Sequence, residues 1–586
     1  MVDYTRWTKE SLVERVKELE DALKRRPAVP ETTENAILEP TEGAGASAGA
    51  AGKKGKKKNR PDKGTKKKGG KGLDPSKYST RYVALKLAYL GKNYNGFEYQ
   101  PCGTIPSIEE ELWKALVKSC LIFPEKPDEV DYGPWEYSKC GRTDKGVSAF
   151  GQVIGIRLRS NRPLPKEKKE EEARQDGDGE DVKMGEETVV DPEEGKPEWD
   201  PVADEIQYCK VLNRLLPPDI RVLAWAPTLP PNFSARFSCR ERQYRYFFTQ
   251  PAFPPVPTSL EGGPVTKGAM KDGWLDIDKM REAAKLFEGV HDFRNFCKID
   301  PTKQLTTFAR RIFESDIVEV KDVSTALPYL NHEQFRPQGA GSADGVHPKV
   351  YYFHVRGSAF LWHQIRCMVS VLFLVAQGLE PPSIISDLLD ITKNPRKPNY
   401  NMADEVPLVL WDCIFPQLEE EVTAMDSREA IRLDEEAHDP TAEVDTNLQD
   451  AIDWDWISDP TASDNLISQL WGHWREKKMD ELLANRLLDC MSSRFNLAKA
   501  IEASASKPAK RGVASQRIFD GGNNGRLMGQ YVPMLKRQLQ PSVEETNDKW
   551  AQSKGFANAE EMTRIKNWRT AIKEAKAAVS NTSTPP

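Results

Sequence analysis

The charged residues of this chain are gathered into separate blocks, and this segregation decides where a folded core can form. Between Lys53 and Lys71, eleven of nineteen residues are Lys or Arg and one is acidic. Between residues 167 and 198, fourteen residues are Asp or Glu and five are Lys or Arg. Such segments repel themselves and bury little apolar surface, so we expect both to be disordered and the core to lie outside them.

Overall composition excludes several classes of protein. No apolar run is long enough to cross a bilayer, and the first residues, MVDYTRWTKE, do not form a secretory signal. The nine cysteines form no CxxC pair and only seven histidines are present, so we expect neither a disulfide framework nor a metal site. The net charge of -5 argues against nucleic-acid binding only as an average, because positive and negative charge are separated along the chain.

Periodic apolar patterns predict the regular elements of the core. Ser107, followed three residues later by Glu110, is typical of a helix start, and Gly378 of a helix end. Alternation predicts strands at 82–91, 151–160, 220–228, 310–320 and 349–360. Helical spacing predicts helices at 7–26, 105–121, 204–217, 276–290, 361–378 and 463–505. In the last of these, Trp471 and Trp474 predict a buried face.

The polar turn from Cys140 to Gly146 is the first candidate for chemistry. It reads CGRTDKG and leads into the apolar strand that ends at Ser160. A carboxylate at Asp144, held beside Arg142, would stay ionised and could act as a nucleophile or a base. Taken alone, an Arg and an Asp in one turn are more often a structural ion pair.

The segment GRTDKGVSA around Asp144 resembles the catalytic motif of the TruA family of tRNA pseudouridine synthases. The resemblance implies that Asp144 is the essential catalytic carboxylate, that Arg142 assists it and that Lys145 belongs to the substrate-binding residues. A second segment, FSARFSCRERQYRYFF, resembles the family motif in which a tyrosine packs over the target base. That place is taken by Tyr244, with Tyr246 as the nearby alternative.

Basic and aromatic side chains alternate in this second segment, beginning at Arg236, as RNA binding requires. A third segment, GSAFLWHQIRCMVSVLF, resembles the helix whose arginine reaches the catalytic carboxylate. The resemblance therefore implies that Arg366 contacts Asp144, and a lone Arg in so apolar a helix needs a buried partner. His363 is expected to be structural or to face a phosphate.

With two smaller likenesses, the resemblance covers about residues 82–415. EGVHDFRNFCK resembles the family's GxHDF-like segment and adds His291 to the substrate-binding residues, and LAYLGKNYNGFEYQ resembles the opening strand and turn. The residues after the Asp, the N-terminal helix and the closing segment 529–555 resemble the eukaryotic branch, which modifies uridines 38 and 39 of the anticodon stem-loop.

The family resemblance implies an α+β fold. We expect two halves that share a mixed, largely antiparallel central sheet, with helices on one face and a central basic cleft. The expected parts are an amphipathic or coiled-coil helix (1–27), a disordered basic linker (28–80), an N-terminal catalytic half with the acidic insert (81–275), a C-terminal half (276–416), and an acidic linker, helical segment and extension (417–586).

The chemistry implied is cleavage of the C1′–N1 bond of uridine and rejoining of the uracil through C5. Asp144 would either attack C1′ or take a ribose proton, and no cofactor or metal is needed. The expected partners are the anticodon stem-loop of tRNA and a second copy of the chain in a homodimer, without a membrane. The basic run would be an import signal or an RNA-binding arm, and we expect the protein in nucleus and cytoplasm.

Other functions fit parts of the sequence. A synthase of the related branch would act at other tRNA positions, which sequencing of the modified tRNA would reveal. A tRNA-binding protein or chaperone could have kept the fold and lost catalysis, and a nuclear scaffold could use only the helix and tails. An Asp144→Asn protein that works like wild type would support the binder, whereas modification that survives deletion of residues 1–75 would count against the scaffold.

Overall fold

A computed structural model describes residues 73–164, 199–255, 273–321, 348–416, 449–456, 466–492, 516–523, 525–528 and 531–565, with isolated positions at 494, 496, 499, 568, 570 and 572. The expected N-terminal helix, the basic run and the body of the acidic insert lie outside these residues. No helix in the described part of the chain is both long and apolar enough to span a membrane.

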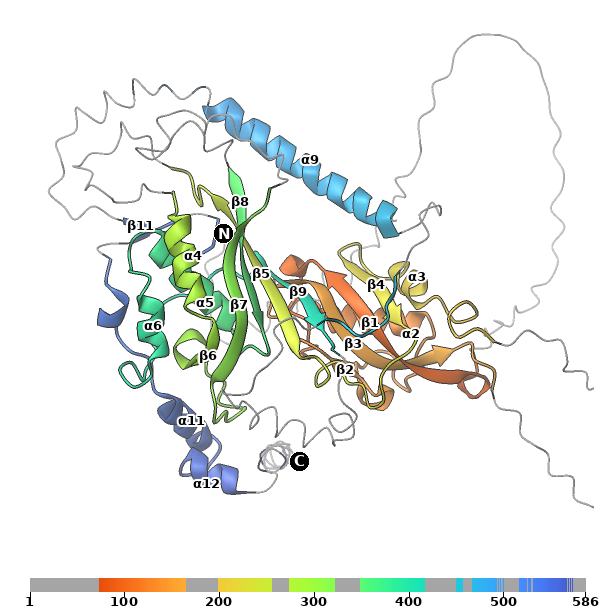
Figure 1. Ribbon diagram of the computed structural model, residues 1–586. Coiled ribbons are helices and arrows are strands. Elements are labelled where there is room, and N and C mark those ends of the chain that lie inside the picture. Colours follow the sequence, from red (N-terminus) through yellow and green to blue (C-terminus); the bar gives the residue numbers. More distant parts are fainter. Residues whose placement is uncertain are drawn as a thin grey trace, which may run out of the picture. The chain divides into compact units, whose positions relative to one another are not determined.

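The described residues form one ten-stranded sheet with the order β10-β4-β1-β3-β9-β5-β8-β7-β6, in which β2 pairs with β3 (Figure 1). The described ladders are antiparallel except that between β3 and β9. The strands are β1 (Ser79–Tyr89), β2 (Ser138–Lys139), β3 (Ser148–Ser160), β4 (Ile220–Ala226), β5 (Glu241–Gln250), β6 (Gly289–Asp292), β7 (Ala309–Glu319), β8 (Lys349–Gly357), β9 (Leu408–Ile414) and β10 (Asp455–Trp456). The predicted mixed, largely antiparallel sheet is confirmed.

Four described helices pack on this sheet where apolar spacing predicted them, and α6 (Ile384–Leu389) was not predicted. The Ser107 hydroxyl accepts a hydrogen bond from the Glu110 amide at 3.2 Å, which confirms the predicted cap. Gly378 adopts a left-handed φ of 70° just after a helix of thirteen buried residues. The helices are α2 (Ile108–Lys118), α3 (Tyr208–Asn213), α4 (Ile277–Lys285), α5 (Gln364–Ala376) and α6 (Ile384–Leu389).

Two buried apolar clusters lie along the sheet. One gathers residues of β1, β3, β4, α2 and α3, and the other gathers residues of β5, β7, β8, α4, α5 and α6. Tyr244 of β5 packs against both clusters, and β9 contributes residues to both. The two expected halves thus meet at β9 and β5, in the middle of one continuous sheet.

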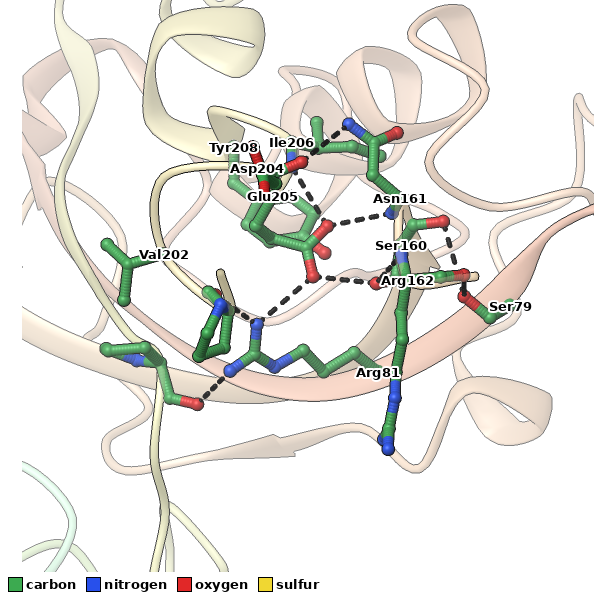
Figure 2. A network of polar contacts seen from close by, with 12 residues as sticks. Ser79, Arg81, Ser160, Asn161, Arg162, Val202, Asp204, Glu205, Ile206 and Tyr208 are labelled. Atoms are coloured by element: carbon green, nitrogen blue, oxygen red, sulfur yellow. Dashed lines mark hydrogen bonds and ion pairs between the residues drawn. The ribbon is translucent and has the colours of Figure 1, made fainter. Parts of the chain in front are cut away.

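A polar network holds together the two described ends that flank the acidic insert (Figure 2). The Glu205 side chain, which is fully buried, accepts hydrogen bonds from the Ser160 hydroxyl at 2.7 Å and the Asn161 amide at 2.9 Å. Arg81 of β1 donates to the same carboxylate at 3.1 Å. Because these contacts join residues on either side of the insert, the core closes without it.

The chain after residue 416 contributes two kinds of structure. Residues 449–456 dock on the sheet edge through β10, although the composition there is acidic. The helix α9 (Leu466–Ser492) has no buried residue, and Trp471 and Trp474 are 61% and 51% exposed, so the predicted buried face is wrong. The two rings contact each other, which accounts for their spacing without a core.

A longer segment that packs on the core begins at residue 516. Glu380, just beyond α5, accepts hydrogen bonds from the Tyr531 hydroxyl and the Met534 amide, both at 2.6 Å. The Gln540 amide donates to the Lys397 carbonyl at 2.8 Å. This segment contains β11 (Gln516–Ile518), β12 (Arg526–Met528), α11 (Val543–Gln552) and α12 (Ala559–Arg564).

Candidate functional site

Asp144 stands in the loop between β2 and β3. The Gln152 side chain exchanges two hydrogen bonds with the backbone of Gly141, at 3.0 and 2.8 Å. The Thr143 hydroxyl hydrogen-bonds with the buried Tyr89 hydroxyl at 2.7 Å. These contacts fix the loop at two residues just before Asp144.

The residues just before α5 approach Asp144 from the other half of the sheet. Trp362 Nε1 donates a hydrogen bond to Asp144 Oδ1 at 3.2 Å. His363 Nε2 lies 3.5 Å from Asp144 Oδ2, and the backbone of His363 has a left-handed φ of 62°. This conformation turns the chain into α5 and brings the two side chains to the carboxylate, which keeps a quarter of its surface exposed.

Electrostatics separate Asp144 from an ordinary surface carboxylate. Burial raises its pKa above the usual value, the Arg366 cation and the Trp362 hydrogen bond oppose this, and Glu405 adds to the increase. Burial, with the cations of Arg366 and Lys298, lowers the pKa of His363 to about 4. His363 is therefore neutral near pH 7 and cannot neutralise Asp144.

Arg366 has a different partner from the one the family resemblance implies. Its Nη2 donates to Glu405 Oε2 at 2.6 Å, and its Nε donates to the Ala403 carbonyl at 2.8 Å. The described residues contain no ion pair between Arg366 and Asp144. The predicted direct contact with Asp144 is therefore wrong in this state, because the guanidinium is bonded to Ala403 and Glu405. Its positive charge still acts on Asp144.

Arg142 also departs from expectation. Its Nε lies 3.4 Å from Glu98 Oε1, and half of its side chain is exposed. The described structure contains no ion pair between Arg142 and Asp144, two residues on, so the prediction that Arg142 holds this carboxylate ionised is wrong. Lys145 follows in the same loop with an exposed side chain.

The two candidate tyrosines of β5 have different environments. Tyr244 is partly buried, and its ring meets the Phe360 ring edge-on at 5.1 Å. In register it pairs with Leu410 of β9, which pairs with Ala149 of β3, so it lies near the strands that carry the Asp144 loop. Tyr246 is fully buried and donates to the Gly521 carbonyl at 3.2 Å, which excludes it as a residue that stacks on a base in this state.

The remaining candidates make local contacts. Arg236 is exposed and its guanidinium lies over the Phe237 ring at 5.1 Å. His291 lies on β6 at the end of the sheet order, and its Nε2 is 2.8 Å from the Glu288 carbonyl oxygen. The structure thus gathers Asp144, His363 and, at longer range, Arg366, while the contacts described for Arg236 and His291 lie elsewhere.

Three further residues at this site were absent from the sequence prediction. Trp362 provides the hydrogen bond to Asp144, and Lys298 lies over the Trp362 ring at 4.4 Å. Glu405 pairs with Arg366 from the loop before β9. Trp362 could have been found because it adjoins His363 in a recognised segment, whereas no local pattern marks Glu405.

A pocket of about 550 Å³ adjoins these residues. It shares His363, Arg366 and Glu405 with the Asp144 site, and the segment after residue 516 supplies part of its wall. Cationic and anionic side chains both face it, so the pocket is not uniformly basic. Its lining is Lys298, His363, Arg366, Cys367, Lys397, Tyr400, Asn401, Met402, Ala403, Asp404, Glu405, Asp520, Gly522 and Gln540.

One group of described side chains has the chemistry of a metal site. The Sγ atoms of Cys140, Cys239 and Cys413 lie within 4.8 Å of one another, and all three residues are buried. Thiolates are ligands for zinc and other soft ions, but these three provide one ligand fewer than a structural zinc site uses. No local sequence pattern indicates this cluster, because its three cysteines are far apart along the chain and form no CxxC pair.

Comparisons with known proteins show which family this chain resembles. A family model described as tRNA pseudouridine synthase matches residues 283–416. The tRNA pseudouridine(38/39) synthase of Bos taurus is 39% identical over 418 residues, covering 71% of this chain and 68% of that protein. The protein of the same name from Saccharomyces cerevisiae is 36% identical over 433 residues, covering 73% and 75%.

A more distant relative, tRNA pseudouridine synthase A of Methanothrix thermoacetophila, is 27% identical over 340 residues, covering 58% of this chain and 84% of that protein. The similarity to the bovine and yeast proteins extends over most of each chain. The chain therefore belongs to the TruA-type tRNA pseudouridine synthases.

Proposed function

We propose that this enzyme converts uridine to pseudouridine at positions 38 and 39 of the tRNA anticodon stem-loop, with Asp144 as the reacting carboxylate. The observation that carries the proposal is the setting of Asp144. It is a partly exposed carboxylate that accepts a single described hydrogen bond, from Trp362, and lies beside a pocket in a member of this family. The two positions rest on the names of the bovine and yeast relatives.

Asp144 acts on the ribose of the target uridine, which has to leave its stack to reach the carboxylate. Unstacking costs a few kcal/mol, approximately, and contacts to the extruded nucleotide offset this cost. Trp362 and the neutral His363 hold the carboxylate in position, and Lys298 and Lys397 at the pocket provide positive charge for the RNA backbone. The partly buried ring of Tyr244 is the candidate to pack on the base.

Assembly and location complete the proposal. We infer a homodimer, as the family resemblance implies. We also infer action in nucleus and cytoplasm, with the basic run between Lys53 and Lys71 as the import signal or RNA-binding arm. Sedimentation of the full chain and localisation of a protein lacking residues 53–71 test these two inferences.

Mapping of pseudouridine in unmodified tRNA incubated with the wild-type protein tests the positions. New carbodiimide-dependent stops at 38 and 39 are expected. Stops at other positions would keep the chemistry and transfer the chain to the related branch. Binding of tRNA without any new stop would contradict the proposal in favour of a non-catalytic RNA-binding protein.

A further inference from the structure

Glu405 lies between the Asp144 loop and α5. Gly146, two residues after Asp144, has a left-handed φ of 83°, and a Cβ at this glycine would come within 2.5 Å of Glu405 Cγ. Only glycine therefore allows the Glu405 side chain to lie against the loop. About a third of this side chain remains exposed, so it can respond to a bound substrate.

The guanidinium of Arg366 is held by the segment that carries Glu405. Glu405 is its described charge partner, at 2.6 Å, and the Ala403 carbonyl accepts from its Nε. The Ala403 amide in turn donates to the Arg366 carbonyl at 3.1 Å, so segment and helix fix each other. The charge of this buried guanidinium therefore acts on two carboxylates, Asp144 and Glu405.

We propose that Glu405 is a positioning residue of the reaction, which competes with Asp144 for the guanidinium of Arg366. With Glu405 in place, the Asp144 carboxylate has two polar partners among the described side chains: Trp362, which donates a hydrogen bond, and the neutral His363 at 3.5 Å. Without the Glu405 charge, the positive charge of Arg366 acts more strongly on Asp144, and the Nη2 donor that Glu405 held becomes available to it. This inference rests on the proposed function and adds a residue that tunes its carboxylate.

The direction of the effect follows from the charges that face Asp144. His363 and Arg366 face it from the start of α5, Glu405 from the loop before β9, and Lys303 from the turn after residue 300. Glu405 raises the pKa of Asp144, whereas Arg366 and Lys303 lower it. Removing the negative charge of Glu405 therefore lowers the pKa of Asp144, and the ionised form persists to lower pH.

The test is the pH dependence of single-turnover kcat/KM on tRNA for wild type and Glu405→Gln. The acid limb reports the ionisation of the essential carboxylate. We expect this limb to move down by at least about half a pH unit in Glu405→Gln, which makes the variant about threefold faster than wild type below the limb. Glu405→Ala should move it in the same direction, and Glu405→Asp, which keeps the charge, should return it toward wild type.

Glu136→Gln is the matched control, because Glu136 also pairs with an arginine, Arg157 at 2.7 Å, in an exposed position outside the site. It should leave the acid limb in place. Folded Glu405→Gln and Glu405→Ala proteins with an unmoved limb, or a limb moved to higher pH, would overturn the inference. A wild-type protein that forms no pseudouridine would instead overturn the proposed function.

Discussion

Asp144 and Glu205 are two carboxylates in loops beside the same sheet, and they have opposite surroundings. Glu205 accepts hydrogen bonds from Arg81, Ser160, Asn161 and the Ile206 amide, and these lower its pKa although burial alone would raise it (Figure 2). Among the described residues, the Asp144 carboxylate accepts one hydrogen bond, from Trp362, and burial raises its pKa. A fully bonded carboxylate stabilises the fold, whereas an incompletely bonded one remains available to a substrate.

The largest effect that would sharpen this comparison is expected at Glu205. Glu205→Gln removes the buried negative charge that faces Arg81. It also puts an amide NH₂ in place of a carboxylate oxygen, among groups that all donate hydrogen bonds to it. The free energy of unfolding should fall by about 2–4 kcal/mol, measured by urea denaturation. The rate per folded molecule should not change. A stable variant with lost activity would reverse the roles of the two carboxylates.

Trp362→Phe is expected to have a moderate effect on Asp144. The ring remains, but its Nε1–H, the donor to Asp144, is lost. Because this hydrogen bond lowers the pKa of Asp144, its removal raises that pKa further. The acid limb of kcat/KM should move up by about half a pH unit or more, opposite in sign to Glu405→Gln. Unchanged limbs in Trp362→Phe would show that the hydrogen bond is irrelevant to ionisation.

The smallest effect is expected for the acidic insert. Replacing residues 165–198 with a short Gly-Ser linker leaves the contacts of Glu205 with Ser160 and Asn161 intact. Loop length costs little free energy, roughly 0.6 kcal/mol for a doubling, so the melting temperature should stay within about 3 °C of wild type. A large loss of stability in calorimetry would mean that the network does not close the core by itself.

Sequence patterns predicted strands β1, β3, β4, β7 and β8 and helices α2, α3, α4 and α5, because apolar periodicity, the Ser107 cap and the motif around Asp144 are local. They did not predict β5 and β9, the two strands at which the halves of the sheet meet. They could not predict the partner of Arg366. Glu405 reaches Arg366 through tertiary packing, and Trp362 meets Asp144 across 218 residues of chain. The family resemblance suggested Asp144 as the partner, and it could not show which of two nearby carboxylates holds the guanidinium.

Other errors have equally physical reasons. Tyr244 and Tyr246 lie two residues apart, so both point to the same face of β5. Tyr246, however, is buried against Phe373 of α5, and strand alternation cannot tell a residue in a cleft from one in the core. Trp471 and Trp474 were expected to be buried because they are aromatic on a helix, yet they contact each other on an exposed surface. Spacing predicts which residues share a face, and it does not predict what covers that face.

The most direct test of this account is the single-turnover rate and melting temperature of Asp144→Asn, measured beside Glu205→Gln on the same tRNA. Since burial raises the pKa of Asp144, the ionised carboxylate costs stability in the fold, and its removal should leave the melting temperature unchanged or slightly higher. Its rate of pseudouridine formation should fall at least about a thousandfold. An Asp144→Asn protein that keeps more than about a tenth of the wild-type rate would contradict the assignment of Asp144 as the reacting carboxylate.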